Sequence, residues 1–179
     1  MLFSIVLALT LSQIPDAPIA KKQVPSAEQG PSSSSLELQG DKLGESPEAF
    51  LAQHPKAECD KSQKSWVTCY QWADVSIFGL TAQPAAGCNL KKRYAADCLQ
   101  GLTARFTEQR MVSLVYTVAG TDKTAAAAAL QKQLGTPTMN SRDGTVWSSG
   151  NTTASVVVGK AMEEKDAPSL ITISIATTN

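Results

Sequence analysis

The chain contains a single histidine, His54, so any site that needs an imidazole has to be built around it. Nucleophilic catalysis by serine, threonine or cysteine needs a general base within hydrogen-bond reach. His54 is followed by Pro55, which ends a helix at this point, and we interpret the histidine as an exposed or capping residue. The sequence therefore predicts no catalytic residue, no metal site and no bound cofactor.

Carboxylates and basic residues are equally numerous, with sixteen of each. This balance gives no electrostatic reason to expect a nucleic-acid partner. The closest pair of acids, Glu163 and Glu164, stands among charged residues and is interpreted as a solvated loop, as is the basic run 91–93. A hydrolase that uses Asp or Glu stays open as an alternative, and it would need two carboxylates ~5–10 Å apart in a cleft.

Four cysteines follow the spacing C-x9-C-x18-C-x9-C, namely Cys59, Cys69, Cys88 and Cys98. A zinc site would use pairs separated by two to four residues, and this spacing has none. An even number of cysteines in an exported chain indicates disulfides. Of the three pairings we favour Cys59–Cys69 and Cys88–Cys98, because short intervals close most readily as the chain folds.

Aromatic residues are concentrated in one predicted strand, where Trp66, Tyr70 and Trp72 share a face by their period of two. Two interpretations stay open. The three rings pack in the core beneath the first helix, or they form an exposed strip that recognises a protein. Trp147 is the candidate counterpart in the second half of the chain. These four aromatics are the predicted binding residues.

The N-terminal part of the chain divides into two segments of different composition. Residues 1–20 carry a ten-residue apolar run and predict a signal peptide, because the run is too short to span ~30 Å of hydrocarbon. Residues 21–40 are rich in Ser, Pro and Gln and predict a disordered linker. We therefore expect a secreted or periplasmic protein that has no stable membrane insertion after cleavage.

Residues 41–179 are predicted to contain two helices with clear start and stop residues, and several strands. Ser46 and Pro47 begin a helix over 46–54, and Gly135 ends a second over 122–134. The strands are expected within 66–118 and within 145–176. The resulting fold class is α+β, a single domain of two helix-then-strands repeats (41–118 and 119–179) with both helices on one face of an antiparallel sheet.

This order of elements resembles the tandem repeat of the β-lactamase inhibitory protein and the single repeat of the BamE-type outer-membrane assembly lipoproteins. The residues that carry the resemblance are those around the helix ends, 43–48 and 134–137. The resemblance is topological and covers residues 41–179. It implies an inhibitor or envelope-assembly factor, and we expect a non-enzymatic module whose sheet face binds another protein in the envelope or medium.

A small-ligand carrier is a further alternative, since it needs only an apolar cavity of ~300 Å³ or more between the helices and the sheet. The helix over 122–134 contains five consecutive alanines. Their small side chains favour a close approach of this helix to the sheet. We therefore expect no such cavity.

Overall fold

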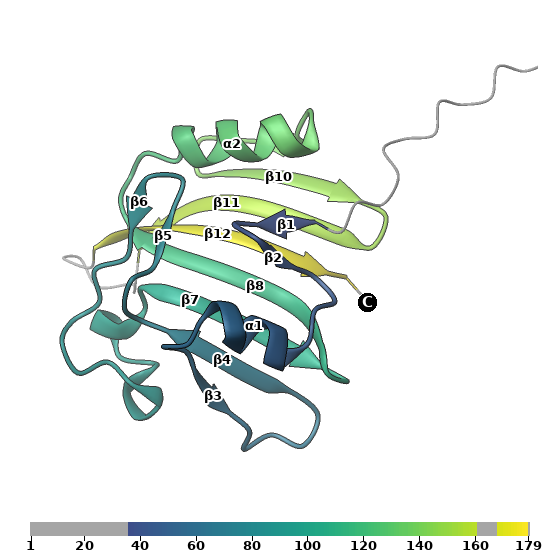
Figure 1. Ribbon diagram of the computed structural model, residues 1–179. Helices are drawn as coiled ribbons and strands as arrows, with labels where there is room; N and C mark the ends of the chain where they lie inside the picture. Colours follow the sequence, from purple (N-terminus) through teal and green to yellow (C-terminus); the bar gives the residue numbers. More distant parts are fainter. Residues whose placement is uncertain (1–35, 161–167, 179) are drawn as a thin grey trace, which may run out of the picture. The chain divides into compact units, whose positions relative to one another are not determined.

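The computed structural model describes residues 36–160 and 168–178 of this chain. One eight-stranded antiparallel sheet dominates them, in the order β3-β4-β7-β8-β12-β11-β10-β9 (Figure 1). Its strands are β3 (Glu58–Asp60), β4 (Val67–Gln71), β7 (Gly101–Thr107), β8 (Arg110–Ala119), β9 (Met139–Asn140), β10 (Gly144–Ser149), β11 (Thr152–Lys160) and β12 (Ser169–Thr177). The long strands β8 and β12 pair with each other at the centre, and the sheet ends on short strands at both edges.

The strands form where apolar and polar residues alternate, as the sequence predicts. β7 and β8 are joined by a two-residue turn in which Glu108 and Gln109 have φ values of 51° and 61°. A turn with two positive φ values has a backbone twist that matches the right-handed twist of the flanking strands. Gly150, with a φ of 57°, lies in the corresponding turn between β10 and β11. Both hairpins lie within the ranges 66–118 and 145–176 in which the sequence predicts strands.

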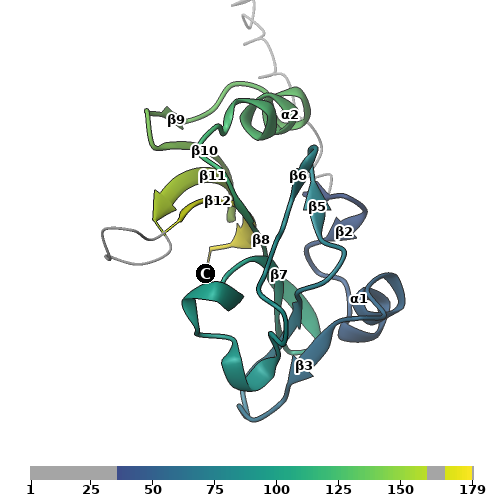
Figure 2. The same cartoon turned by 90° about the vertical axis from the view of Figure 1, so that its left-hand side faces the viewer.

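One face of the sheet, here called the covered face, is apolar and buried. It is packed under two helices, α1 (Pro47–Gln53) and α2 (Thr124–Leu134), and two hairpins, β1 (Glu37–Leu38) with β2 (Asp41–Lys42) and β5 (Ser76–Ile77) with β6 (Leu80–Thr81). Figure 2 shows these elements together on one side of the sheet. Each of the four contributes a side chain with no exposed area: Leu38, Phe50, Ile77 and Leu130.

Both helices begin and end close to the predicted residues. The Ser46 side chain accepts a hydrogen bond from the backbone N–H of Ala49 at 3.2 Å, which caps α1 ahead of Pro47. The His54 backbone N–H donates to the carbonyl of Phe50 and ends the helix before Pro55. Helix α2 ends at Gly135, whose φ is 77°. Residues at the helix ends therefore set the bounds of both helices.

The predicted fold class is wrong. The protein is mostly β, and its helices of 7 and 11 residues do not form a layer in two helix-then-strands repeats over 41–118 and 119–179. The alanine-rich α2 buries only Ala126 and Leu130. Small side chains cover little sheet, so the two hairpins supply the remaining cover. Their two-residue strands are too short to show an alternating pattern in the sequence.

Both predicted disulfides are confirmed. Cys59–Cys69 joins directly opposed residues of β3 and β4, and Cys88–Cys98 closes a loop within residues 82–100. That segment contains two short 3-10 helices, η1 (Leu90–Lys92) and η2 (Ala96–Cys98). In Figure 2 it lies on the opposite side of the sheet from α1 and α2. The two disulfides fit an oxidising compartment such as the periplasm or the extracellular medium.

Three predictions concern residues outside those that the structure describes: the signal peptide over 1–20, most of the linker over 21–40, and the loop with Glu163 and Glu164. The last residues of the predicted linker are structured, because Leu38 of β1 has no exposed area. Residues 36–40 therefore do not belong to a disordered linker. No helix within 36–160 or 168–178 has the length and apolar content needed to cross a membrane.

Candidate functional site

The second face of the sheet, here called the open face, carries short polar and β-branched side chains. A row of cross-strand partners crosses seven strands, and its members share one side of the sheet. The row consists of Tyr70, Thr103, Val115, Ser174, Ser155, Val146 and Met139. Each of these residues is partly or fully exposed, whereas their neighbours along the strands are mostly buried. Apart from the end near Trp72, where the segment 82–100 packs on it, the face is therefore exposed and is not part of the core.

Large apolar side chains are exposed at both ends of this face. At one end Met139 of β9 is 56% exposed, and Val157 of β11 is 40% exposed. At the other end Trp66, just before β4, is 36% exposed and Tyr94, beside η1, is 74% exposed. Within the described residues, these are all the large apolar side chains that are markedly exposed. These side chains lie on one side of the sheet, in a pair at each end of it, and they are the strongest sign of an interaction surface.

An arginine and three aromatic rings form a cluster where the segment 82–100 meets β4. The Arg93 guanidinium lies 4.7 Å from the ring centroid of Tyr94 and 5.7 Å from that of Tyr70. Tyr70 in turn stacks on Trp72, with ring centroids 5.5 Å apart. Arg93 also forms a 2.8 Å ion pair with Asp60. The prediction that 91–93 is merely solvated therefore does not describe Arg93.

The electrostatics of this cluster keep its groups in their ordinary charge states. A hydrogen bond to Tyr94 raises the pKa of Arg93. The backbone N–H of Ser62 donates to Asp60 and lowers the pKa of that carboxyl, so the ion pair stays charged. Burial raises the pKa of Tyr70, which keeps its hydroxyl protonated. The cluster offers cation–π and hydrogen-bonding contacts and has no group activated for chemistry.

The four predicted binding aromatics have different environments. Trp66 stays at the surface, with the Arg105 guanidinium 4.5 Å from its ring centroid. Tyr70 is half-buried. Trp72 is buried under the segment 82–100, and its Nε1 donates to the Cys98 carbonyl at 3.2 Å.

Trp147 differs from the other three. It is 4% exposed, belongs to the core cluster on the covered face, and donates to the Gly135 carbonyl at 2.9 Å. Its Nε1 thereby satisfies a carbonyl at the end of α2. This position lies on the opposite side of the sheet from Trp66. Trp147 therefore contributes to packing and is not part of the open face.

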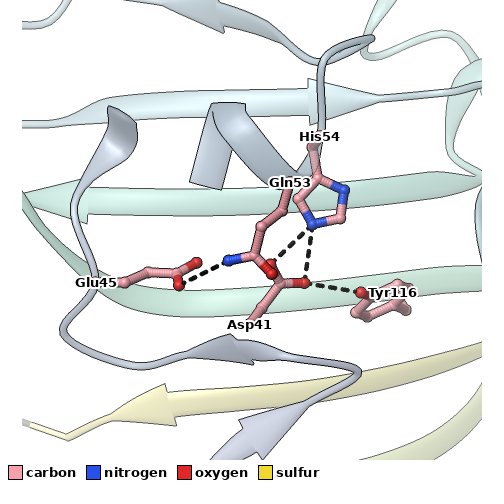
Figure 3. A network of polar contacts seen from close by, with 5 residues as sticks. All are labelled: Asp41, Glu45, Gln53, His54 and Tyr116. Carbon is pink, nitrogen blue, oxygen red and sulfur yellow. Dashed lines mark hydrogen bonds and ion pairs between the residues drawn. The ribbon is translucent and has the colours of Figure 1, made fainter. Parts of the chain in front are cut away.

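A second polar group lies on the covered side, around the buried carboxylate of Asp41 (Figure 3). His54 Nε2 is 2.8 Å and 3.0 Å from the two carboxylate oxygens. The Tyr116 hydroxyl donates to the same carboxylate at 3.0 Å. Asp41 is 1% exposed, so these contacts replace its hydration. They link the β1–β2 hairpin to helix α1 and strand β8.

Two neighbours of Asp41 have pKa values that are raised by burial and by its negative charge. Burial and the Asp41 carboxylate both raise the pKa of Tyr116, which stays protonated and donates. Burial, followed by Asp41, raises the pKa of Glu45, whose Oε2 accepts from Gln53 at 3.4 Å. Two carboxylates with differing environments would suit acid–base chemistry only if both faced a substrate. Neither Asp41 nor Glu45 lines the cavity next to His54, so the pair serves to hold the hairpin.

The chain matches no protein-family model, no curated protein and no solved structure. Among residues 36–160 and 168–178, no group of three or more His, Cys, Asp and Glu side chains could hold a metal ion.

Several residues of both sites are missed by reasoning from the sequence. Val157 and Met139 fall in or near strands, but which face they occupy depends on pairing register. Asp41 lies at the edge of the predicted linker, and its burial follows from contacts with residues 13 and 75 positions away. No local pattern marks such a residue.

Proposed function

We propose that this chain is an exported, non-enzymatic module that binds another protein through the open face, as an inhibitor or an envelope-associated factor does. The observation that carries the proposal is the exposure of Trp66 and Tyr94 at one end of that face and of Val157 and Met139 at the other. Aromatic and apolar side chains in such a setting are typical of interface hot spots.

The rest of the face suits recognition for an entropic reason. Its Ser, Thr and Val side chains have few rotamers, so little conformational entropy is lost when a partner covers them. The antiparallel ladder holds them in fixed positions; Ser155 and Ser174, for example, are joined by a 2.8 Å hydrogen bond between hydroxyls. A rigid surface of this kind binds without reorganisation.

The charge of the face indicates what the partner carries. Arg105 lies on the open face beside Trp66 and forms no salt bridge within the described residues. An acidic side chain of the partner would pair with it, and the Trp66 ring would shield that pair from water. We therefore propose a partner surface that combines an apolar patch with at least one carboxylate.

Cross-linking from defined positions tests the face directly. A photo-reactive residue at 157 is expected to capture the partner from the native envelope or medium, whereas one at the exposed Lys132 of α2 is expected not to. After identification by mass spectrometry, Val157→Asp and Trp66→Ala are each expected to weaken binding of the purified partner by about tenfold or more. Lys132→Asp is the matched control and should change the affinity less than about twofold.

The opposite results would overturn the proposal. If Val157→Asp and Trp66→Ala leave the dissociation constant unchanged, the open face is not the binding surface. If Trp66→Ala lowers the thermal midpoint and leaves binding intact, the ring serves packing alone. Circular dichroism of each variant separates these outcomes from unfolding.

A further inference from the structure

One end of the open face is both basic and aromatic, and it continues onto the segment 82–100, which lies on the same side of the sheet (Figure 2). We call it the basic–aromatic end and define it by seven residues from the β3–β4 loop, β7 and that segment: Lys64, Trp66, Lys91, Lys92, Arg93, Tyr94 and Arg105. Five of the seven are lysine or arginine, and the other two carry the exposed rings of this end.

Contacts join the members of this end into one surface. Thr68 of β4 has Asp60 and Arg105 as its two cross-strand neighbours, so these three side chains share the open face. Arg93 reaches the same row through its 2.8 Å ion pair with Asp60. The Arg105 guanidinium in turn lies 4.5 Å from the ring centroid of Trp66. Residues that are far apart in the sequence therefore form a continuous patch.

Two aromatic rings stand at the surface of this patch. Tyr94 is 74% exposed and Trp66 is 36% exposed. Each ring has an apolar body and a polar tip, the phenol hydroxyl and the indole N–H. Tyrosine and tryptophan are enriched where a membrane meets water, because such rings lie among the headgroups with one end apolar and the other wet.

Positive charge exceeds negative charge at the basic–aromatic end. Lys64, Lys91 and Lys92 are exposed and form no salt bridge within the part of the chain that the structure describes. The acids of the same segments are Glu58, Asp60 and Asp97, and the second of these is already paired with Arg93. Acidic and basic side chains are equally numerous in the whole chain, so this excess is local. It turns the basic–aromatic end toward an anionic surface.

The lysines distinguish between the kinds of anionic surface. A rigid protein partner has to fix their long side chains at a cost in rotamer entropy, and lysine is depleted from protein–protein interfaces. Anionic lipid headgroups diffuse toward the charge and leave the side chain mobile. Each lysine near such a bilayer strengthens binding roughly fivefold. Exposed lysines beside Tyr94 and Trp66 therefore favour a membrane surface.

We propose that the basic–aromatic end rests on a bilayer that contains anionic phospholipids, with Tyr94 and Trp66 at the level of the headgroups and the lysines against the lipid phosphates. The contact is peripheral, because the rings enter the headgroup region while the sheet stays in water. The proposal goes beyond the proposed function, which concerns a protein partner, and does not depend on it.

Co-sedimentation of the full disulfide-bonded chain with lipid vesicles tests this proposal. The chain is expected to bind vesicles of equal parts phosphatidylglycerol and phosphatidylcholine, and to stay in solution with phosphatidylcholine alone. Added salt should weaken the binding, because it screens exposed charges. Lys91→Glu combined with Lys92→Glu is expected to weaken it about tenfold or more.

Lys132→Glu combined with Arg142→Glu is the matched control. It makes the same change in net charge at exposed residues of α2 and of the β9–β10 loop, away from the basic–aromatic end. Its dissociation constant for the mixed vesicles should stay within about threefold of the wild-type value. Circular dichroism checks that each variant is folded.

Tryptophan emission provides a second, local measurement. Trp72 and Trp147 are buried, so a change in emission on vesicle binding reports Trp66. The emission is expected to move to shorter wavelength when the mixed vesicles are added. Trp66→Phe should abolish this shift.

Four results would each overturn the proposal. They are the absence of binding to the mixed vesicles at low salt, equal binding to both kinds of vesicle, equal weakening by the two charge reversals, and an unchanged emission of Trp66 in the bound protein. Binding of polyglutamate without binding of vesicles would instead assign the patch to an acidic protein. None of these results bears on the open-face experiments with Val157→Asp, which use a protein partner.

Discussion

The two faces of the sheet are made by the same strands and have opposite compositions. On β12, Ile171, Ile173 and Ile175 point to the covered face and have no exposed area, while Thr172 and Ser174 between them are partly exposed. Burial of large apolar side chains stabilises the fold from one side. The other side contributes less to stability, and it is the side proposed above for recognition of a partner. Burial therefore changes from complete to partial between residues that are adjacent along one strand.

Adjacent residues of β12 should show the largest contrast. Ile173→Ala removes a fully buried side chain and is expected to lower the free energy of unfolding by about 2–5 kcal/mol, because it leaves a cavity. Thr172→Ala, one residue away, is expected to change it by about 0.5 kcal/mol or less. Urea unfolding followed by circular dichroism measures both. Similar losses for the two variants would mean that the open face is also part of the core.

The next largest effect is expected when removal of one disulfide is compared with removal of the other. Replacing Cys88 and Cys98 by alanine is expected to lower the free energy of unfolding by ~2–3 kcal/mol, since the unfolded chain gains freedom. It should also loosen the segment over Trp72 and shift tryptophan emission to longer wavelength.

The Cys59→Ala, Cys69→Ala pair is the matched control for that shift. It opens a loop of the same sequence separation and should leave the emission of Trp72 in place. Equal shifts in both variants would contradict the role assigned to the segment 82–100.

The smallest expected effect concerns Glu45, near Asp41. Burial raises the pKa of Glu45 in the folded protein, so folding favours its protonated form. The stabilising contribution is therefore present below the ordinary glutamate pKa of about 4.3 and is lost as the pH rises through the raised pKa.

Glu45→Gln should consequently be more stable than the wild type at neutral pH, and the difference should vanish in acid. Thermal unfolding as a function of pH measures it. The exposed Glu108→Gln substitution in the β7–β8 turn is the control and should show no such trend. A larger advantage for Glu45→Gln in acid would contradict the sign of the shift.

Local features of the fold are predictable because they depend on neighbouring residues. Ser46 and Pro47 begin α1, Gly135 ends α2, and the short cysteine intervals close as expected. The fold class is predicted wrongly, because it depends on what covers the sheet. The β1–β2 and β5–β6 hairpins are built from strands of two residues, which leave no periodic signal.

The candidate sites likewise combine features that the sequence predicts with features that it does not. Alternation places Trp66, Tyr70 and Trp72 on one face of a strand, but it cannot tell whether that face is covered. The segment 82–100 buries Trp72 and leaves Trp66 exposed, which only a long-range contact decides. Trp147 is on the other face because of its register with Ala154.

The sequence by itself determines where the two helices and the long strands of the sheet lie and which cysteines pair, since these depend on backbone sterics, local hydrogen bonds and short loop closure. The tertiary structure alone decides which face is open, which aromatic rings are buried, and that Asp41, His54 and Tyr116 meet beside a cavity. The physical reason is that burial is a property of all the segments packed around a residue, and segments distant in the chain leave no mark on its local pattern.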